Sequence, residues 1–231
     1  MKLGGLQKTT LIDYPGKIAC TVFTIGCDFR CPFCYSGELV LPEKIKNRPI
    51  LPEGNFFDFL KERKGLLEGI VLCGGEPTIH KDLPNFVKKI KELGYSVKLD
   101  TNGSNPEMLK KLIEEKLINY AAMDIKSSKE KYEVYSGMKI DLSEIEKSVD
   151  TLEQGKIDYE FRTTLAPGVN EGDIKKIADW IGPAKKYFLQ EFNNKKEIIE
   201  PGIISLPTLQ REEIEELIKK IKSKFEICQL R

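Results

Sequence analysis

Residues 18–36 read IACTVFTIGCDFRCPFCYS, and this stretch joins a strand-like run to a cluster of cysteines. Its first part, Ile18–Ile25, is rich in β-branched and aromatic residues, which is typical of a buried strand. Its second part places Cys27, Cys31 and Cys34 close together, with three and then two residues between them. Three thiolates at this spacing can converge on one centre from a loop that directly follows the strand.

The rest of the chain alternates strand-like runs with amphipathic helical segments. After Ile18–Ile25, the predicted strands are Gly69–Leu72, Tyr95–Asp100, Tyr120–Ile125, Asp158–Leu165 and Lys186–Glu191. We expect helices over Asp58–Lys64, Leu83–Leu93 and Glu171–Ile181, helices that begin at Asn105-Pro106 and at Asp141, and a last helix around Ile214–Ile221. This alternation predicts an α/β fold with parallel strands and outer helices, in a single domain over residues 1–231. An open, partial barrel and a doubly wound sheet both fit six such units.

Composition excludes several classes of protein. The chain has 231 residues, of which 40% are hydrophobic and 32% charged, as in an ordinary globular protein. Lys+Arg 37 against Asp+Glu 36 leaves a net charge of +1, so neither nucleic acid nor a membrane surface is indicated as a partner. The apolar runs are far shorter than the roughly 18 residues of a membrane span. The N-terminal residues lack the apolar core of a signal peptide, and we expect a cytoplasmic protein.

In a reducing cytoplasm, clustered cysteines indicate metal or redox chemistry and not disulfides. Three thiolates can hold a zinc ion with a fourth ligand, or three corners of a 4Fe-4S cube. A zinc site would need Cys20, Cys73 or His80 as its fourth ligand, because the chain has no second CxxC pair. A cube on three cysteines leaves one iron open, as a catalytic metal site does for its substrate. The cysteines alone leave both alternatives open.

Polar residues gather where the predicted strands end, and ligands of parallel α/β folds bind at such ends. Gly74-Gly75-Glu76-Pro77 follows the second predicted strand. Asp100, Asp124 and Lys126 lie at the ends of the third and fourth predicted strands. Asp124 and Lys126 could simply form a surface ion pair. Arg162 lies inside the fifth predicted strand, where an unpaired charge is costly. We therefore expect Arg162 to have a buried partner or an anionic ligand.

The cysteine pattern, with Phe33 directly before its third member, resembles the signature of the radical S-adenosylmethionine (radical SAM) superfamily. Gly74-Gly75-Glu76-Pro77 stands where that family has its second motif. The stretch from Gly4 to Gly16 is similar to anaerobic ribonucleoside-triphosphate reductase activating proteins. Two further stretches, Asp100–Gly103 and Met123–Lys126, resemble pyruvate formate-lyase activating enzyme, as does Arg162. Both are glycyl-radical enzyme activating enzymes, and the resemblance covers the chain through about Gln190.

This resemblance implies a partial open (β/α)6 barrel of the radical SAM type, with the cluster loop at residues 26–36. It implies one 4Fe-4S cluster on Cys27, Cys31 and Cys34, with the fourth iron free to bind S-adenosylmethionine. The enzyme would cleave that cofactor to a 5′-deoxyadenosyl radical and install a glycyl radical on a partner, expected to be an anaerobic ribonucleoside-triphosphate reductase. A flavodoxin or ferredoxin would supply the electron, because the chain has no second cysteine cluster.

The resemblance also implies roles for single residues. Gly74 and Gly75 would let the methionyl end of the cofactor approach the backbone, since they carry no side chain. Glu76 would accept a hydrogen bond from its ammonium group, Asp124 from its ribose, and Lys126 would pair with its carboxylate. The other implied cofactor-binding residues are Phe33, Tyr35, Asp100, Arg162, Val169 and Gln190.

Two other functions fit parts of the pattern. A radical SAM enzyme that acts on a small molecule, similar to the 7-carboxy-7-deazaguanine synthases, would share the cluster, although those enzymes carry a different cysteine spacing. A non-catalytic zinc-binding protein would share only the thiolates.

Overall fold

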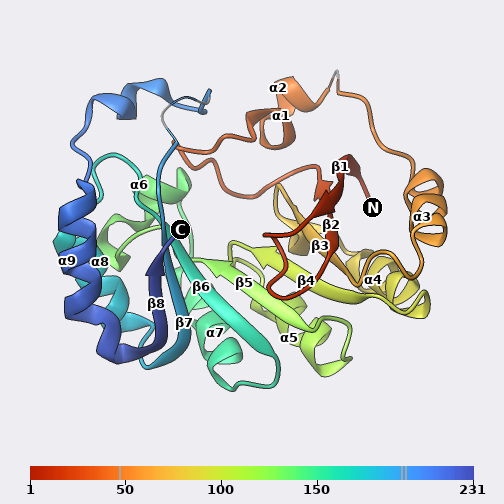
Figure 1. Ribbon diagram of the computed structural model, residues 1–231. Helices are drawn as coiled ribbons and strands as arrows, with labels where there is room; N and C mark the ends of the chain where they lie inside the picture. Colours follow the sequence, from red (N-terminus) through yellow and green to blue (C-terminus); the bar gives the residue numbers. More distant parts are fainter. Residues whose placement is uncertain (47, 194, 196) are drawn as a thin grey trace.

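The computed structural model describes residues 1–46, 48–193, 195 and 197–231, and its strands form one eight-stranded sheet in the order β1 to β8 (Figure 1). Strand β1 is antiparallel to β2, and all later neighbours are parallel. The strands are β1 Leu3–Thr10, β2 Ala19–Thr24, β3 Gly69–Gly74, β4 Ser96–Thr101, β5 Tyr120–Asp124, β6 Asp158–Thr164, β7 Ala184–Gln190 and β8 Phe225–Leu230.

The connections between parallel strands carry helices on the outer side of the curved sheet (Figure 1). Among the described residues, β1 and β8 do not pair with each other, so the barrel is open between these two edges. The helices are α1 Gly37–Val40, α2 Pro42–Ile45, α3 Glu53–Glu62, α4 Leu83–Glu92, α5 Pro106–Glu114, α6 Tyr132–Ser136, α7 Leu142–Glu153, α8 Glu171–Trp180 and α9 Arg211–Ile221, with short 3₁₀ turns at η1 Pro77–Ile79, η2 Lys129–Lys131, η3 Pro201–Ser205 and η4 Lys222–Lys224.

The predicted α/β fold with an open, partial barrel is confirmed. All six predicted strands are present as β2 to β7, with ends shifted by a few residues. The strand order follows the chain order without reversal, which is the winding of a barrel and not of a doubly wound sheet. The sequence reading missed β1 and β8, which add one strand at each edge.

The helix starts follow local capping chemistry. The side chain of Asn105 accepts a hydrogen bond from the N–H of Met108, and Pro106 takes the first helical position, as predicted. Asp141 caps α7 by accepting from the N–H of Ser143. The predicted start of α3 at Asp58 is wrong: the helix begins five residues earlier, directly after the extended residue Pro52. No helix in the described part of the chain is long and apolar enough to cross a membrane.

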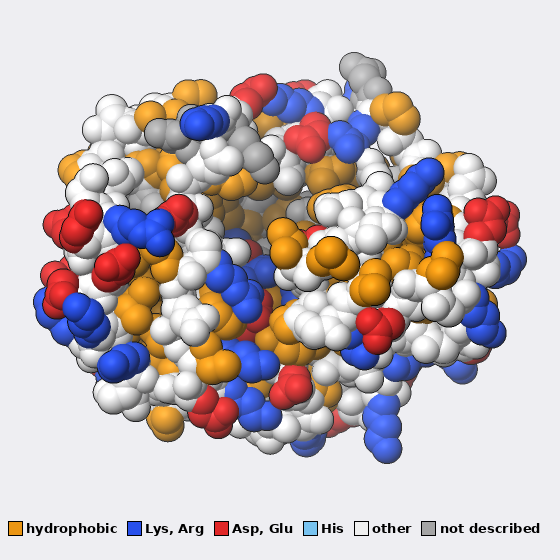
Figure 2. Space-filling view, viewed as in Figure 1, with side chains coloured by type: hydrophobic (Ala, Val, Ile, Leu, Met, Phe, Trp, Pro, Cys, Tyr) orange, Lys and Arg blue, Asp and Glu red, His pale blue; other side chains and the backbone are white. Residues whose placement is uncertain are grey.

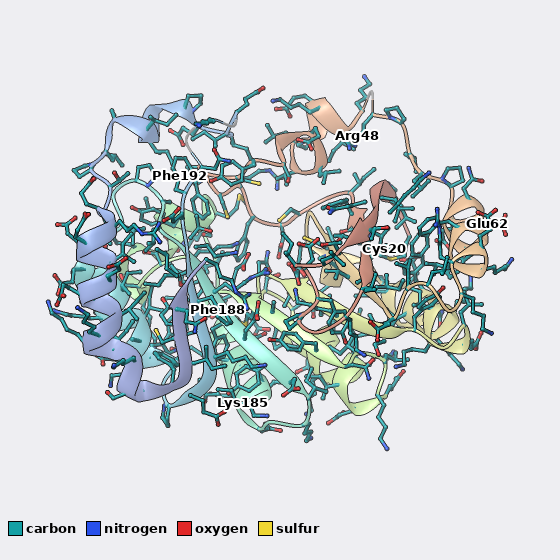
Figure 3. The ribbon with its side chains drawn as sticks, viewed as in Figure 1. Cys20, Arg48, Glu62, Lys185, Phe188 and Phe192 are labelled. Atoms are coloured by element: carbon teal, nitrogen blue, oxygen red, sulfur yellow. The ribbon has the colours of Figure 1, made fainter. Side chains whose placement is uncertain are left out.

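Alternation along the strands gives the sheet an apolar outer face and a polar inner face. Cys20 on β2 (Figure 3) is fully buried in the same core as Leu60 of α3 and Phe86 of α4, so it serves as a small apolar residue. On the inner face, β4 carries Lys98 and Asp100, and β6 carries Glu160 and Arg162. The charges therefore lie inside the barrel.

The end of β3 packs backbone against backbone on the start of the cysteine loop. The N–H of Gly75 donates to the carbonyl of Thr24 at 2.9 Å, and the N–H of Glu76 donates to the carbonyl of Gly26 at 2.7 Å. A Cβ at position 75 would stand 1.9 Å from the carbonyl oxygen of Gly26. Glycine at position 75 thus fixes the distance between β3 and the loop.

Gly75→Ala is expected to destabilise the protein, because two backbone segments must separate to admit the methyl group. Overpacking of this kind costs about 1–3 kcal/mol in free energy of unfolding. Gly54→Ala is the matched control: no atom lies within 4 Å of the added Cβ in α3, and alanine should stabilise that helix by about 0.5–1 kcal/mol. Denaturant unfolding of both variants measures the difference. Equal stability of the two would contradict the close approach.

Candidate active site

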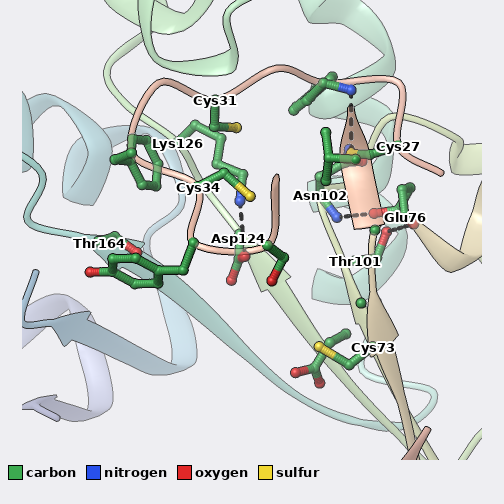
Figure 4. Close-up of a pocket in the computed structure, with 18 of the residues that line it drawn as sticks. Cys27, Cys31, Cys34, Cys73, Glu76, Thr101, Asn102, Asp124, Lys126 and Thr164 are labelled. Atoms are coloured by element: carbon green, nitrogen blue, oxygen red, sulfur yellow. Dashed lines mark hydrogen bonds and ion pairs between the residues drawn. The ribbon is translucent and has the colours of Figure 1, made fainter. Parts of the chain in front are cut away.

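One cavity of about 190 Å³ lies inside the barrel, between the strand ends and the cysteine loop (Figure 4). Nearly all the sequence-predicted site residues line it. They are Cys27, Cys31, Phe33, Cys34, Tyr35, Gly74, Gly75, Glu76, Asp100, Asp124, Lys126 and Arg162. The topology explains this convergence, because parallel strands end at the same edge of the sheet.

Two predicted residues are not among those that line the cavity. Val169 is only 3% exposed and packs in the core, and its N–H donates to the carbonyl of Ala166. Gln190 ends β7, and its carbonyl accepts from the N–H of Leu165. Their cofactor-binding roles stay predictions.

The three cysteines are free thiols on one loop, and all three line the cavity. Burial raises the pKa of Cys31 to about 11 and also raises the pKa values of Cys27 and Cys34. A bound metal reverses this effect, because a coordinating thiol loses its proton. Among the described residues, no three Cys, His, Asp or Glu side chains stand close enough to hold a metal ion. The N–H of Phe29 donates to the Cys27 sulfur at 3.3 Å, and hydrogen bonds of this kind are compatible with a sulfur that ligates iron.

Glu76 joins the ends of β3 and β4. Its carboxylate is 1% exposed and accepts four hydrogen bonds. Two come from the N–H and hydroxyl of Thr78, at 3.0 and 2.6 Å, one from the hydroxyl of Thr101 at 2.8 Å, and one from the N–H of Asn102 at 2.6 Å. Burial raises the pKa of Glu76 to about 7, although these donors oppose the shift. Three of the four bonds are to Oε1 and one, from Asn102, is to Oε2.

Asn102 carries this connection to the cysteine loop. Its side-chain amide donates to the carboxylate of Asp28 at 2.9 Å and stands 3.9 Å from the sulfur of Cys27 (Figure 4). The end of β4 is therefore hydrogen-bonded both to Glu76 and to the loop that holds the thiols. Asp28 and Asn102 hold the loop from the side of Cys27.

A chain of alternating charges crosses the inner face of β4, β5 and β6. The guanidinium of Arg162 donates to Asp100 at 3.0 Å and to Asp124 at 2.8 Å. Asp124 also pairs with Lys126 at 2.9 Å, and Asp100 pairs with Lys98. The expected buried partner of Arg162 is confirmed, and it is a pair of carboxylates.

The charge chain stabilises the charged forms of Asp124 and Lys126. Burial disfavours the charged form of Asp124, but Arg162 and Lys126 more than offset it, and the pKa of Asp124 lies below its ordinary value. The pKa of Lys126 is raised for the same reason, mainly by Asp124 against the opposing effect of burial. The Asp124–Lys126 pair exists as the sequence suggested, but it lines the cavity and not the outer surface.

Sequence reasoning did not single out several other residues that line the cavity. Thr101 and Asn102 belong to the quoted Asp-Thr-Asn-Gly stretch, which was the available signal. The remaining ones, for which the residue type gave no signal, are Phe29, Ser36, Val40 and Thr164. Cys73, which the sequence offered only as a fourth zinc ligand, also lines the cavity near Asp100 and Arg162, and burial raises its pKa to about 12.

The chain belongs to the radical SAM superfamily, because the model of that family matches residues 21–181. A "putative glycyl-radical enzyme activating enzyme" of Methanocaldococcus jannaschii is 34% identical over 95% of this chain and 91% of its own length. A second protein of that organism with the same description is 27% identical over 86% of this chain and 77% of its own.

Among solved structures, Streptococcus suis SuiB bound to S-adenosylmethionine superposes with a TM-score of 0.66 at 15% identity. The match covers 90% of this chain, which spans 50% of the length of SuiB. At this identity the likeness shows the shared fold.

Membership of the family gives the cofactors: a 4Fe-4S cluster and S-adenosylmethionine. The donor set fits the cluster, because three cysteines from one short loop face one cavity and thiolates are the ligands of such clusters. The residues around them fit a zwitterionic ligand, since the cavity offers the ammonium of Lys126 and the carboxylate of Asp124 side by side.

Arg162→Gln is expected to cost about 3–5 kcal/mol in free energy of unfolding at neutral pH, because it leaves Asp100 and Asp124 buried without their shared cation. Arg211→Gln is the matched control: Arg211 also contacts two carboxylates, of Glu191 and Glu215, but is 67% exposed, and its loss should cost at most about 1 kcal/mol.

The sign of the pH dependence follows from Asp124. A carboxyl with a depressed folded pKa stabilises the protein above its unfolded value, and this contribution is lost as the pH falls towards the folded pKa. The gap between wild type and Arg162→Gln should therefore shrink below about pH 4. A gap that is independent of pH in urea unfolding would contradict the charge chain.

Proposed function

We propose that this chain is an activase that installs a glycyl radical on a partner enzyme, the partner being an anaerobic ribonucleoside-triphosphate reductase. The observation that carries the proposal is a single cavity in which three cysteines, the Gly-Gly-Glu turn and the charge chain meet. The similar proteins of M. jannaschii support the activase function through their descriptions. The reductase as partner rests on the N-terminal resemblance.

When bound, the cluster and S-adenosylmethionine supply a 5′-deoxyadenosyl radical: one electron breaks the bond between the 5′-carbon and sulfur and releases methionine. The target glycine gives up one hydrogen atom from its α-carbon to that radical. The products are 5′-deoxyadenosine and a protein glycyl radical, and the electron comes from a flavodoxin or ferredoxin.

The residues of the chain bind and orient the cofactor in this proposal. Cys27, Cys31 and Cys34 hold the cluster, and the bare backbone at Gly74 and Gly75 receives the methionyl end. Lys126 donates one of its three N–H bonds to Asp124, so the other donors can bind the cofactor's carboxylate. Asp124 and Asp100 accept from the ribose side, held in place by Arg162. Phe33 and Tyr35 shield the cluster or pack on the adenine.

Glu76 has a structural role beside the one that the resemblance implies. Its oxygens already accept four hydrogen bonds from the protein. Three of these bonds are to Oε1 and one is to Oε2, so Oε2 keeps an acceptor site for the cofactor's ammonium group. Glu76 thus holds the turn in shape before the cofactor arrives.

A protein target fits the open side of the barrel. The edges β1 and β8 are unpaired with each other in the described chain, and the target segment would approach the cavity from this side. We place the reaction in the cytoplasm, where free thiols are kept reduced, and in a single domain over residues 1–231.

The test uses the anaerobically reconstituted protein with dithionite, S-adenosylmethionine and the purified reductase. We expect a doublet glycyl signal in electron paramagnetic resonance, and transfer of deuterium into 5′-deoxyadenosine when the reductase is labelled at its glycine α-carbons. Cys31→Ala should abolish both readouts. Cys228→Ala, which changes a half-buried thiol outside the cavity, should leave both unchanged.

The activase proposal would be wrong if 5′-deoxyadenosine gained deuterium only from a labelled small molecule and no protein radical formed. The protein would then be a radical SAM enzyme that acts on a small molecule. A partner other than the reductase would be indicated if another glycyl-radical enzyme gave the doublet and the reductase did not.

A further inference from the structure

The side-chain amide of Asn102 contacts both a sulfur and a carboxylate of the cysteine loop (Figure 4). Its nitrogen Nδ2 donates to Oδ1 of Asp28 at 2.9 Å and lies 3.9 Å from the sulfur of Cys27, within reach of a sulfur acceptor. That sulfur lies 3.9 Å from the same carboxylate oxygen. The three groups form a triangle, and the amide has one N–H for each of the other two.

The hydrogen bonds around Asn102 determine which way its amide points. The N–H of Ser104 donates to Oδ1 of Asn102 at 2.9 Å, and only the oxygen end of an amide can accept such a bond. Nδ2 must therefore face Cys27 and Asp28. The backbone N–H of Asn102 donates to Glu76 at 2.6 Å, so bonds to the backbone and to the side chain both hold this residue at the end of β4.

The contact between the amide and the sulfur is shielded from water. Asn102 is 5% exposed, the Cys27 thiol is half-buried, and both residues line the cavity. Figure 2 shows the molecule hollowed near its centre, where Figure 1 draws the cysteine loop close to the ends of the parallel strands. A hydrogen bond in such surroundings is electrostatically stronger than in water.

Asn102 is also singular in its position. Within the described part of the chain, no other side chain from outside the cysteine loop donates to the sulfur of Cys27, Cys31 or Cys34. The reduction potential of an iron–sulfur cluster depends on hydrogen bonds to its sulfurs and on nearby charge. Reduction adds one electron, and no bond forms or breaks. A donor to a ligating sulfur favours the reduced, more negative state, whereas a carboxylate beside that sulfur disfavours it.

We propose that Asn102 is a positioning residue that raises the reduction potential of the cluster. It donates to the ligating sulfur of Cys27, and it offsets the negative charge of Asp28 beside that sulfur. The inference goes beyond the proposed function, because it concerns the entry of the electron and holds for any substrate of the enzyme. The end of β4 then serves both to hold the cysteine loop and to make the cluster easier to reduce.

The test is a reductive titration of the anaerobically reconstituted protein, followed by the electron paramagnetic resonance signal of the reduced cluster. Dithionite gives the electron and is itself oxidised. Asn102→Asp replaces the amide donors by a carboxylate of the same shape and keeps the oxygen that accepts from Ser104. We expect its potential to fall, with a one-electron equilibrium constant about tenfold smaller, which corresponds to about 59 mV. The swap Asp28→Asn/Asn102→Asp puts one amide and one carboxylate back beside the sulfur, and it should recover most of this shift.

Asn105→Asp is the matched control, because it makes the same chemical change on the same loop. The side chain of Asn105 accepts from the N–H of Met108 and donates to the carbonyl of Thr78 at 2.9 Å, but it does not line the cavity. The control should titrate at the wild-type potential. Asn102→Leu removes the donors without adding a charge, and it should also lower the potential, by less than Asn102→Asp.

Equal potentials in wild type and Asn102→Asp would overturn the inference, and so would equal shifts in Asn102→Asp and Asn105→Asp. Loss of the iron from both Asn102→Asp and Asn102→Leu would overturn it too, because Asn102 would then be needed only to hold the loop. The failure of the proposed function looks different: wild type would form no glycyl radical on the reductase, and the differences in potential would remain.

Discussion

The carboxylate of Glu76 is the interaction on which the arrangement of the site depends. It is buried at the point where β3 and β4 end, and its four hydrogen bonds join the turn after β3 to Thr101 and Asn102. Asn102 in turn bonds Asp28 in the cysteine loop. Without an acceptor at position 76, four N–H or hydroxyl donors from two strand ends would lose their partner inside the protein. One carboxylate thus sets the position of the cluster loop relative to the sheet.

The second organising feature is the charge chain on the opposite side of the cavity. Arg162 neutralises two carboxylates from two other strands, and Lys126 extends the chain towards Cys31 and Phe33. Such buried charges cost desolvation free energy, and good geometry with every charge paired is what makes them tolerable. At the end of this charge chain, Lys126 lies on the side of the thiols and has N–H donors that Asp124 does not use. The two features have separate structural roles: Glu76 holds the backbone at the strand ends, and the charge chain lines the cavity with charged groups.

The sequence predicted the six inner strands because their buried runs are short, apolar and β-branched. It did not predict β1, which contains two glycines and bulges between Leu3 and Gly5 and between Gln7 and Thr10, so its alternation is interrupted. Strand β8 was not predicted because only one of its residues, Phe225, is buried, so its sequence lacks an apolar run. The site residues were predictable where they belong to motifs. The pairing of Arg162 with Asp100 and Asp124 was not, because it depends on strand register, which places Arg162 beside Asp124 on the neighbouring strand.

The most direct test of the site is anomalous diffraction at the iron edge, from crystals grown anaerobically with reconstituted protein and S-adenosylmethionine. The account predicts iron density inside the cavity, bonded to Cys27, Cys31 and Cys34, with the cofactor between the open iron and the turn at Gly74–Gly75. A single zinc peak, or a cluster with Cys73 as its fourth ligand, would contradict it.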